Sequence, residues 1–131
     1  MGNITKVAVL PITDKKLLMC RKRGIEALIN LGGRVEEGET DTACAEREVL
    51  EEAQCGVENL HHYTTVTAPR IDDPHSQIEL RCYFGDLTGE PTVRESDSII
   101  GFTHIDRTYD STKLPPAMQK VFAKLISDGY L

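Results

Sequence analysis

Three glutamates in the middle of the chain have the spacing that brings carboxylates together on one face of a helix. They are Glu48, Glu51 and Glu52, at positions i, i+3 and i+4. Because each helical residue turns by about 100°, these side chains lie along one stripe. Like charges at this spacing destabilise a helix, so we expect a cation to offset them. A set of ligands made only of oxygens suits a hard divalent cation, and the pattern predicts Mg²⁺ or Mn²⁺.

The residues around this stripe offer a partner and also an alternative interpretation. Arg47 lies i, i+4 from Glu51 and can neutralise one carboxylate, which leaves two. Val49, Leu50 and Ala53 fall on the opposite side of the helix and are expected to pack against a sheet. An exposed acidic face that binds no metal is the alternative, since glutamate is common on exposed helix faces.

The segment that begins at Gly33 decides between these interpretations. Its sequence, GRVEEGETDTACAEREVLEEAQC, resembles the Nudix box, G-x5-E-x7-R-E-U-x-E-E-x-G-U, in which U is a bulky aliphatic residue. The positions that match at the required spacing are Gly33, Glu39, Arg47, Glu48, Val49, Glu51 and Glu52. Agreement at this many fixed spacings makes the motif specific.

The chain departs from the box where the helix should end. Gln54 stands where the box has Gly, and Cys55 stands where it has an aliphatic residue. Gly56 and Val57 restore the Gly-U pair two residues late, so we expect a lengthened or shifted helix end. Leu31 replaces the proline that often precedes the glycine pair. None of these changes removes a carboxylate.

The resemblance implies a role for each matching residue. Glu48 and Glu52 would be the main metal ligands, and Glu51 a further ligand or the group that orients the attacking water. The backbone carbonyl of Gly32 would add another ligand. Arg47 would be one of the catalytic residues and would hold the carboxylates in place. Glu39 and Gly33 would support the metal ligands from behind.

Members of this family cleave a diphosphate linked to another moiety, by water attack on phosphorus. The resemblance therefore implies a pyrophosphohydrolase that acts on a phosphoanhydride bond of a nucleoside diphosphate linked to another moiety. A nucleoside triphosphate and an oxidised nucleotide are among the candidate substrates. The alternative within the same fold is a catalytically silent nucleotide sensor or regulatory binding protein. A second alternative is an acidic interaction module that binds no metal.

Further candidates lie outside the box. Glu95 and Asp97 precede the strand expected at 98–106 and could supply an extra acid. Arg21, Arg23 and Arg34 could receive phosphate oxygens; in an alternating strand, Arg21 and Arg23 share a face. Beyond these, the loop expected at 67–76 contains Arg70 and His75, which could contact the leaving group or simply be exposed to solvent.

Composition sets limits on the class of protein. The chain has 131 residues with 40% hydrophobic and 27% charged residues, which predicts one globular domain over 1–131. A net charge of −6 argues against non-specific binding to nucleic acid. We expect a small-molecule nucleotide or other diphosphate as substrate and no specific nucleic-acid binding. The sequence has no long apolar stretch, and the four cysteines lack paired spacing, so we expect no membrane association, free thiols and a cytoplasmic location. A homodimer is among the assemblies that remain open.

The elements that must position these residues can be predicted from periodicity. Strands are expected at 4–12, 17–21 and 25–31, the last entering a glycine loop at Gly32 and Gly33. Helices are expected at 41–54, with Thr40 or Asp41 as cap, and after Pro116. Further strands are expected at 57–66, 77–87 and 98–106. This order, with the family resemblance, predicts an α/β fold, a Nudix-like α/β/α sandwich with a mixed β-sheet.

Overall fold

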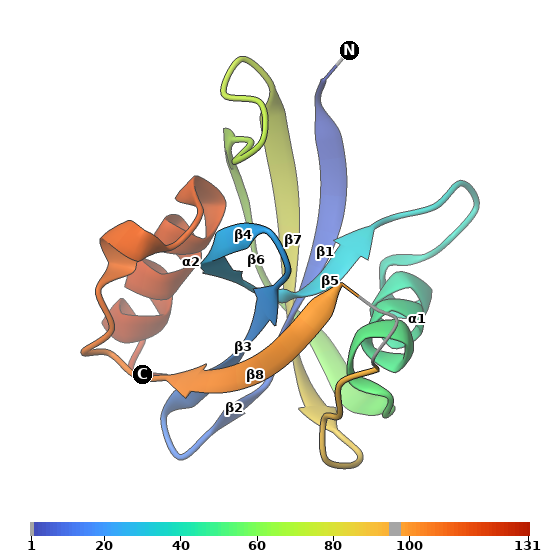
Figure 1. Cartoon of the computed structure of the whole chain (residues 1–131). Coiled ribbons are helices and arrows are strands. Elements are labelled where there is room, and N and C mark those ends of the chain that lie inside the picture. Colours follow the sequence, from blue (N-terminus) through green and yellow to red (C-terminus); the bar gives the residue numbers. More distant parts are fainter. Residues whose placement is uncertain (1, 95–97) are drawn as a thin grey trace.

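The computed structural model describes residues 2–94 and 98–131. In chain order these residues form β1 (Ile4–Leu10), β2 (Ile12–Thr13), β3 (Lys16–Lys22), β4 (Ile25–Ile29), β5 (Leu31–Arg34), α1 (Asp41–Ala53), β6 (Val57–Pro69), β7 (Gln77–Leu87), β8 (Ile99–Ile105), the 3₁₀ helix η1 (Ser111–Lys113) and α2 (Pro116–Ser127). Figure 1 shows the strands between α1 and α2.

The strands form two sheets. One has the order β5-β1-β7-β6, and the other has the order β2-β3-β4 with β8 paired to β3. β1 and β7 run parallel, whereas the other pairs are antiparallel. The expected mixed sheet is therefore confirmed, in the form of one mixed and one antiparallel sheet.

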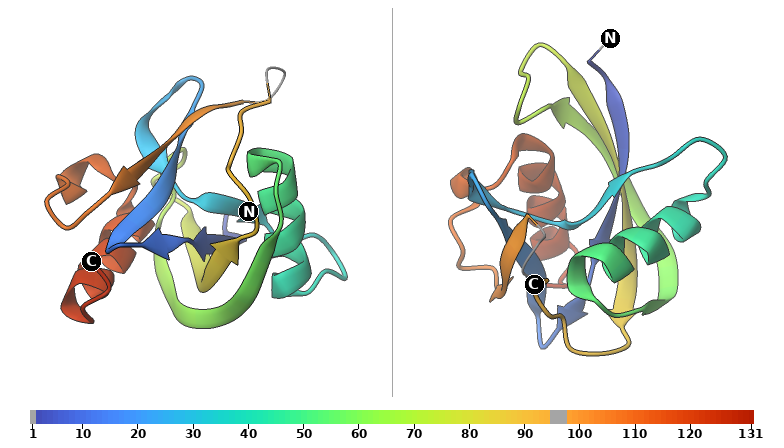
Figure 2. Two further views of the ribbon diagram at one scale, coloured as in Figure 1. Left: turned by 90° about the horizontal axis from the view of Figure 1, so that it is seen from below. Right: turned by 45° about the vertical axis from the view of Figure 1, so that its right-hand side comes forward.

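Alternation along the strands produces two cores. In β1, Val7 and Val9 join the cluster packed against α1, whereas Ala8 and Leu10 join the cluster packed against α2. Because successive side chains of a strand point to opposite faces, one buried strand contributes to both layers. The two helices cover opposite faces of the strands, as the views in Figure 2 show, and the predicted α/β/α sandwich is confirmed.

Helix α1 begins where the sequence predicts. Thr40 is its N-cap, and the Thr40 hydroxyl accepts a hydrogen bond from the Ala43 N–H at 3.1 Å. Val49 and Ala53 are fully buried as expected, but Leu50 is 59% exposed, so its predicted place on the buried face is wrong. Cys44 and Ala45 complete the buried face instead.

The end of α1 corrects a second expectation. The helix stops at Ala53, and Gln54 takes the left-handed conformation with φ 61° and ψ 29°. This is the conformation that favours glycine after a helix, so Gln54 has the backbone role of the box glycine despite its side chain. The predicted lengthening of the helix is wrong, and Gly56 is not its stop.

Other boundaries differ because tertiary pairing overrides local pattern. The first two predicted strands lie in different sheets, and the short hairpin joins β2 to β3 through Asp14 and Lys15, both with positive φ. The glycine pair lies inside β5 rather than in a loop, and η1 was not expected. β6 extends to Pro69, which shortens the loop expected at 67–76.

All four cysteines are free, and Cys20, Cys44 and Cys82 are buried, as predicted. Among the described residues, neither helix has the length and apolar character that crossing a membrane requires.

Candidate metal centre

The glycine pair of β5 makes room for the acidic face of α1. A Cβ at Gly33 would lie 2.5–2.7 Å from the carboxyl atoms of Glu48, and a Cβ at Gly32 would lie 1.9 Å from the Val7 carbonyl oxygen. Gly32 also has a φ of 129°, which side-chain-bearing residues rarely adopt. The pair therefore allows β5 to approach both its partner strand and the Glu48 carboxylate.

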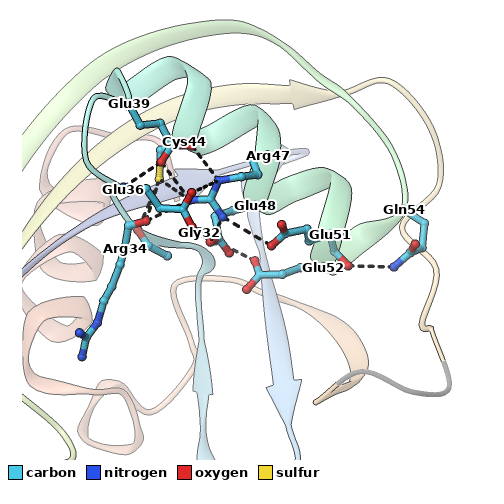
Figure 3. A network of polar contacts seen from close by, with 11 residues as sticks. Gly32, Arg34, Glu36, Glu39, Cys44, Arg47, Glu48, Glu51, Glu52 and Gln54 are labelled. Atoms are coloured by element: carbon cyan, nitrogen blue, oxygen red, sulfur yellow. Dashed lines mark hydrogen bonds and ion pairs between the residues drawn. The ribbon is translucent and has the colours of Figure 1, made fainter.

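Arg47 connects Glu48 of this face to Glu39, which precedes α1. Its guanidinium donates to both carboxyl oxygens of Glu39, at 2.7 and 2.9 Å, and to Glu48 Oε1 at 2.7 Å. The hydrogen bonds from Arg47 hold the pKa of Glu39 at about 2. The expected pairing of Arg47 with Glu51 is present but longer, at 3.5 Å. Figure 3 shows this network along the side of α1.

Glu52 has no comparable cationic partner among residues 2–94 and 98–131. Burial raises its pKa to about 7, although the Gly32 N–H donates to Glu52 Oε1 at 2.9 Å and Lys22 also favours the charged form. The pKa of Glu48 is raised too, because burial outweighs the bonds from Arg47. Two neighbouring carboxylates are thus less stable as anions than in water, and a bound cation would reverse that imbalance.

The donor set fits a divalent cation that keeps part of its water shell. Among residues 2–94 and 98–131, no three His, Cys, Asp or Glu side chains converge into a ready-made cage. Glu51 is 58% exposed, and one oxygen of Glu48 is bonded to Arg47. Mg²⁺ sites commonly use one or two carboxylates together with water and substrate phosphates, so Glu48 and Glu52 suffice as the protein's share.

Glu52 lies between two pockets. The first, of about 450 Å³, is lined by Glu48, Glu51, Glu52, Arg94, Ser98 and Ile99. The second, of about 210 Å³, has mostly apolar walls that include Ile29, Ile78 and Met118, with the polar groups of Lys6, Lys22, Asn30 and Asp72. The acidic cluster therefore borders a polar pocket on one side and a largely apolar one on the other.

Of the three basic residues at the end of β3 and just after it, Arg21, Lys22 and Arg23, the structure brings Lys22 to the site. Lys22 lines the pocket that contains Glu52, whereas Arg21 lines an adjoining pocket of about 920 Å³. Arg23 is exposed, and its N–H bonds to the Ser98 carbonyl. Arg21 and Arg23 share an exposed face, as alternation predicts, and Lys22 lies on the opposite face with the buried Cys20, so the prediction chose the wrong face of the strand.

Lys6 also lines this pocket, and Arg34 lies beside Lys6 in the sheet. Arg34 is paired in register with Lys6, and its side chain extends away from the glutamates in Figure 3. Burial and the neighbouring Lys22 and Arg34 lower the pKa of Lys6. Lys6 was not among the predicted site residues, although a lone lysine inside an apolar strand was the available signal. Substrate binding by Arg21, Arg23 and Arg34 stays a prediction.

The remaining candidates have other positions. Glu95 and Asp97 lie outside the described residues. Arg70 donates to both carboxyl oxygens of Asp72 and to the Gly2 carbonyl, which ties the 70–76 loop to the start of the chain. The His75 backbone N–H donates a hydrogen bond to the Asp73 carboxylate in the same loop.

The structure combines an α/β/α sandwich with a glycine-containing strand beside an acidic helix. The NUDIX domain model matches residues 3–125, and the chain therefore belongs to the Nudix family. No curated protein matches the sequence significantly.

Solved structures share the fold. A UDP-X diphosphatase superposes with a TM-score of 0.78 at 16% identity, over 100% of this chain and 66% of that chain. The E. coli ORF135 protein gives a TM-score of 0.75 at 19% identity, over 98% of this chain and 94% of that one. A MutT NUDIX hydrolase from Burkholderia pseudomallei gives 0.78 at 17% identity, over 95% and 98%. At these identities the likeness shows the fold alone.

Proposed function

We propose that this protein is a divalent-metal-dependent hydrolase that cleaves the phosphoanhydride bond of a nucleoside diphosphate linked to another moiety. The observation that carries the proposal is the pair of half-buried carboxylates, Glu48 and Glu52, with raised pKa values beside the Gly32-Gly33 strand. Membership of the Nudix family and the fold shared with NUDIX hydrolases support it.

Each residue of the site has a separate role in this proposal. Glu48 and Glu52 hold Mg²⁺ or Mn²⁺, with Glu51 and the Gly32 carbonyl as further ligands. When bound, the cation neutralises charge that develops on the phosphoryl oxygens and makes a bound water more acidic. Arg47 restrains Glu48, and the Gly32 N–H orients Glu52. The proton of the attacking water passes to Glu51 or Glu52, the two carboxylates without a short bond to Arg47.

The two pockets give the substrate an orientation. We assign the moiety linked to the diphosphate to the pocket with apolar walls, and the phosphates to the space across Glu52. Lys22 and Lys6 then lie where they can contact phosphate oxygens nearest that moiety. The proposed substrates are small nucleotides, a nucleoside triphosphate and an oxidised nucleotide included, rather than nucleic acid. A cytoplasmic location and a homodimer complete the proposal.

The test is product release from a panel of nucleoside triphosphates and diphosphate conjugates, with Mg²⁺ and with chelator. Native protein, Glu52→Gln and Glu46→Gln are compared, because Glu46 is an exposed glutamate on the same helix. We expect turnover only with Mg²⁺, loss in Glu52→Gln and native rates in Glu46→Gln. Metal-independent turnover, or full activity in Glu52→Gln, would contradict the mechanism. Tight metal-dependent nucleotide binding without turnover would instead identify a sensor.

A further inference from the structure

Gln54 occupies the position of the Nudix-box glycine, and unlike glycine it has a side chain that forms hydrogen bonds. Its backbone occupies the left-handed region, which glycine enters at lower cost. The side-chain Nε2 donates to the Glu51 carbonyl at 3.0 Å, and the side-chain Oε1 accepts a hydrogen bond from Arg94 Nη2. Figure 3 shows the carboxamide at the end of α1, beyond Glu51. There it holds the Arg94 guanidinium.

The segment that carries Arg94 is attached to the same helix end by its backbone. The Thr92 N–H donates to the Ala53 carbonyl at 2.9 Å. Thr88 and Gly56 exchange two bonds, from the Thr88 N–H to the Gly56 carbonyl at 3.0 Å and from the Gly56 N–H to the Thr88 hydroxyl at 3.0 Å. The backbone is therefore held at Thr92, two residues before Arg94. Gln54 holds the guanidinium at the other end of the Arg94 side chain.

Arg94 lines the polar pocket together with all three glutamates of the acidic face. Glu52 lines both this pocket and the apolar one, so the pocket of Arg94 and the pocket of Lys22 lie on either side of Glu52. A phosphate chain that crosses Glu52 with its organic moiety beside Lys22 brings its far end to Arg94. A guanidinium matches phosphate oxygens with two parallel N–H donors, which suits it to that end.

We propose that Arg94 binds the phosphate of the substrate farthest from its organic moiety, and that Gln54 is the residue that positions Arg94 for this contact. The inference rests on the proposed function, whose metal and carboxylates lie between the two pockets. It gives a physical reason for the departure from the box: Gln54 accepts an unfavourable backbone conformation and supplies an anchor that glycine lacks. It also assigns to Arg94 a part in selecting substrates by the number of their phosphates.

The test combines binding and turnover. Inorganic tripolyphosphate with Mg²⁺ is titrated by calorimetry, and kcat and KM are measured for the best nucleotide of the panel. One charge-assisted hydrogen bond predicts that Arg94→Ala weakens tripolyphosphate binding and raises KM about tenfold or more, with kcat changed far less. Arg94→Lys recovers part of the loss. Arg107→Ala is the matched control, because Arg107 is an exposed arginine in a turn after β8.

Gln54→Gly separates positioning from a structural role. Glycine suits the left-handed conformation, so we expect an unchanged or higher Tm together with a raised KM. The double variant Gln54→Gly with Arg94→Ala should bind no more weakly than Arg94→Ala alone, since both remove the same contact. A lower Tm with unchanged KM would assign Gln54 a structural role only, and additive losses would show that Gln54 does not act through Arg94.

The outcomes keep this inference apart from the proposed function. One outcome is metal-dependent turnover by the native protein, while Arg94→Ala keeps the native KM and the native affinity for tripolyphosphate. This outcome overturns the inference and leaves the proposed function standing. Binding of tripolyphosphate that is lost in Arg94→Ala, without turnover of any nucleotide, supports the contact and overturns the hydrolase. Tighter binding of Mg²⁺ alone in Arg94→Ala would show that Arg94 is a counter-ion of the glutamates, and would overturn the inference.

Discussion

Replacing Glu52 by Gln should stabilise the metal-free protein while it destroys the metal site. The pKa of Glu52 is raised from an ordinary value of 4.5 to about 7, chiefly by burial. Each unit of difference corresponds to about 1.4 kcal/mol, so the ionised carboxylate destabilises the fold by at most about 3 kcal/mol above pH 7. Gln is neutral and keeps an oxygen to accept the bond from Gly32. We therefore expect a gain of about 1–3 kcal/mol at pH 8, or roughly 3–10 °C in Tm.

The sign of the pH dependence follows from the direction of the shift. The folded state binds a proton more tightly than the unfolded state, so between pH 4.5 and about 7 native Glu52 is more protonated when folded. Stability of the native protein is therefore lost as pH rises through this window, and Gln removes that loss. Unfolding is followed by circular dichroism in chelator at pH 5 and pH 8, with Glu46→Gln as control. A variant that is less stable than native protein at pH 8, or equally different at both pH values, would refute the reasoning.

Three further variants test the parts around Glu52. Gly33→Ala places a Cβ 2.5 Å from the Glu48 carboxyl carbon. Because the end of the Glu48 side chain can move aside, kcat should fall by about a hundredfold or more in rate assays with little change in Tm. An active variant would contradict the role of Gly33 in making room for Glu48. Glu39→Gln removes the charge that holds Arg47, and activity should fall by about tenfold or more at all pH values above the Glu39 pKa of about 2; a native profile from pH 5 to 9 would exclude this role. Lys22→Ala should raise KM by about tenfold with a smaller effect on kcat, and unchanged kinetics would remove Lys22 from the substrate site.

The parts of the site that are local in sequence could be predicted, because helix geometry alone fixes them. The spacing of Glu48, Glu51 and Glu52 gave the acidic face, and Thr40 gave the start of α1. The apolar sequence of β1 predicted that its residues are buried. It did not predict that they divide between two separate cores. These depend on which helix covers each face, and that is decided by tertiary packing.

The parts that come from distant segments could not be predicted. Lys22 and Glu52 line one pocket although they come from different elements, β3 and α1, and nothing near Arg94 in sequence indicates that Gln54 holds it. Gln54 was expected to extend the helix because glycine is the common residue at a left-handed end. The structure shows that a residue with a side chain can take that conformation where hydrogen bonds hold the side chain on both sides.

The most direct test of the metal centre is a Mn²⁺ titration followed by electron paramagnetic resonance, with native protein, Glu48→Gln, Glu52→Gln and Glu46→Gln at pH 8. The two carboxylates beside the glycine strand predict at least tenfold weaker binding in Glu48→Gln and in Glu52→Gln. Native affinity is expected in Glu46→Gln, whose glutamate is exposed on the same helix. Equal binding by all four proteins would contradict the account, since it is the behaviour of an acidic surface without a metal site.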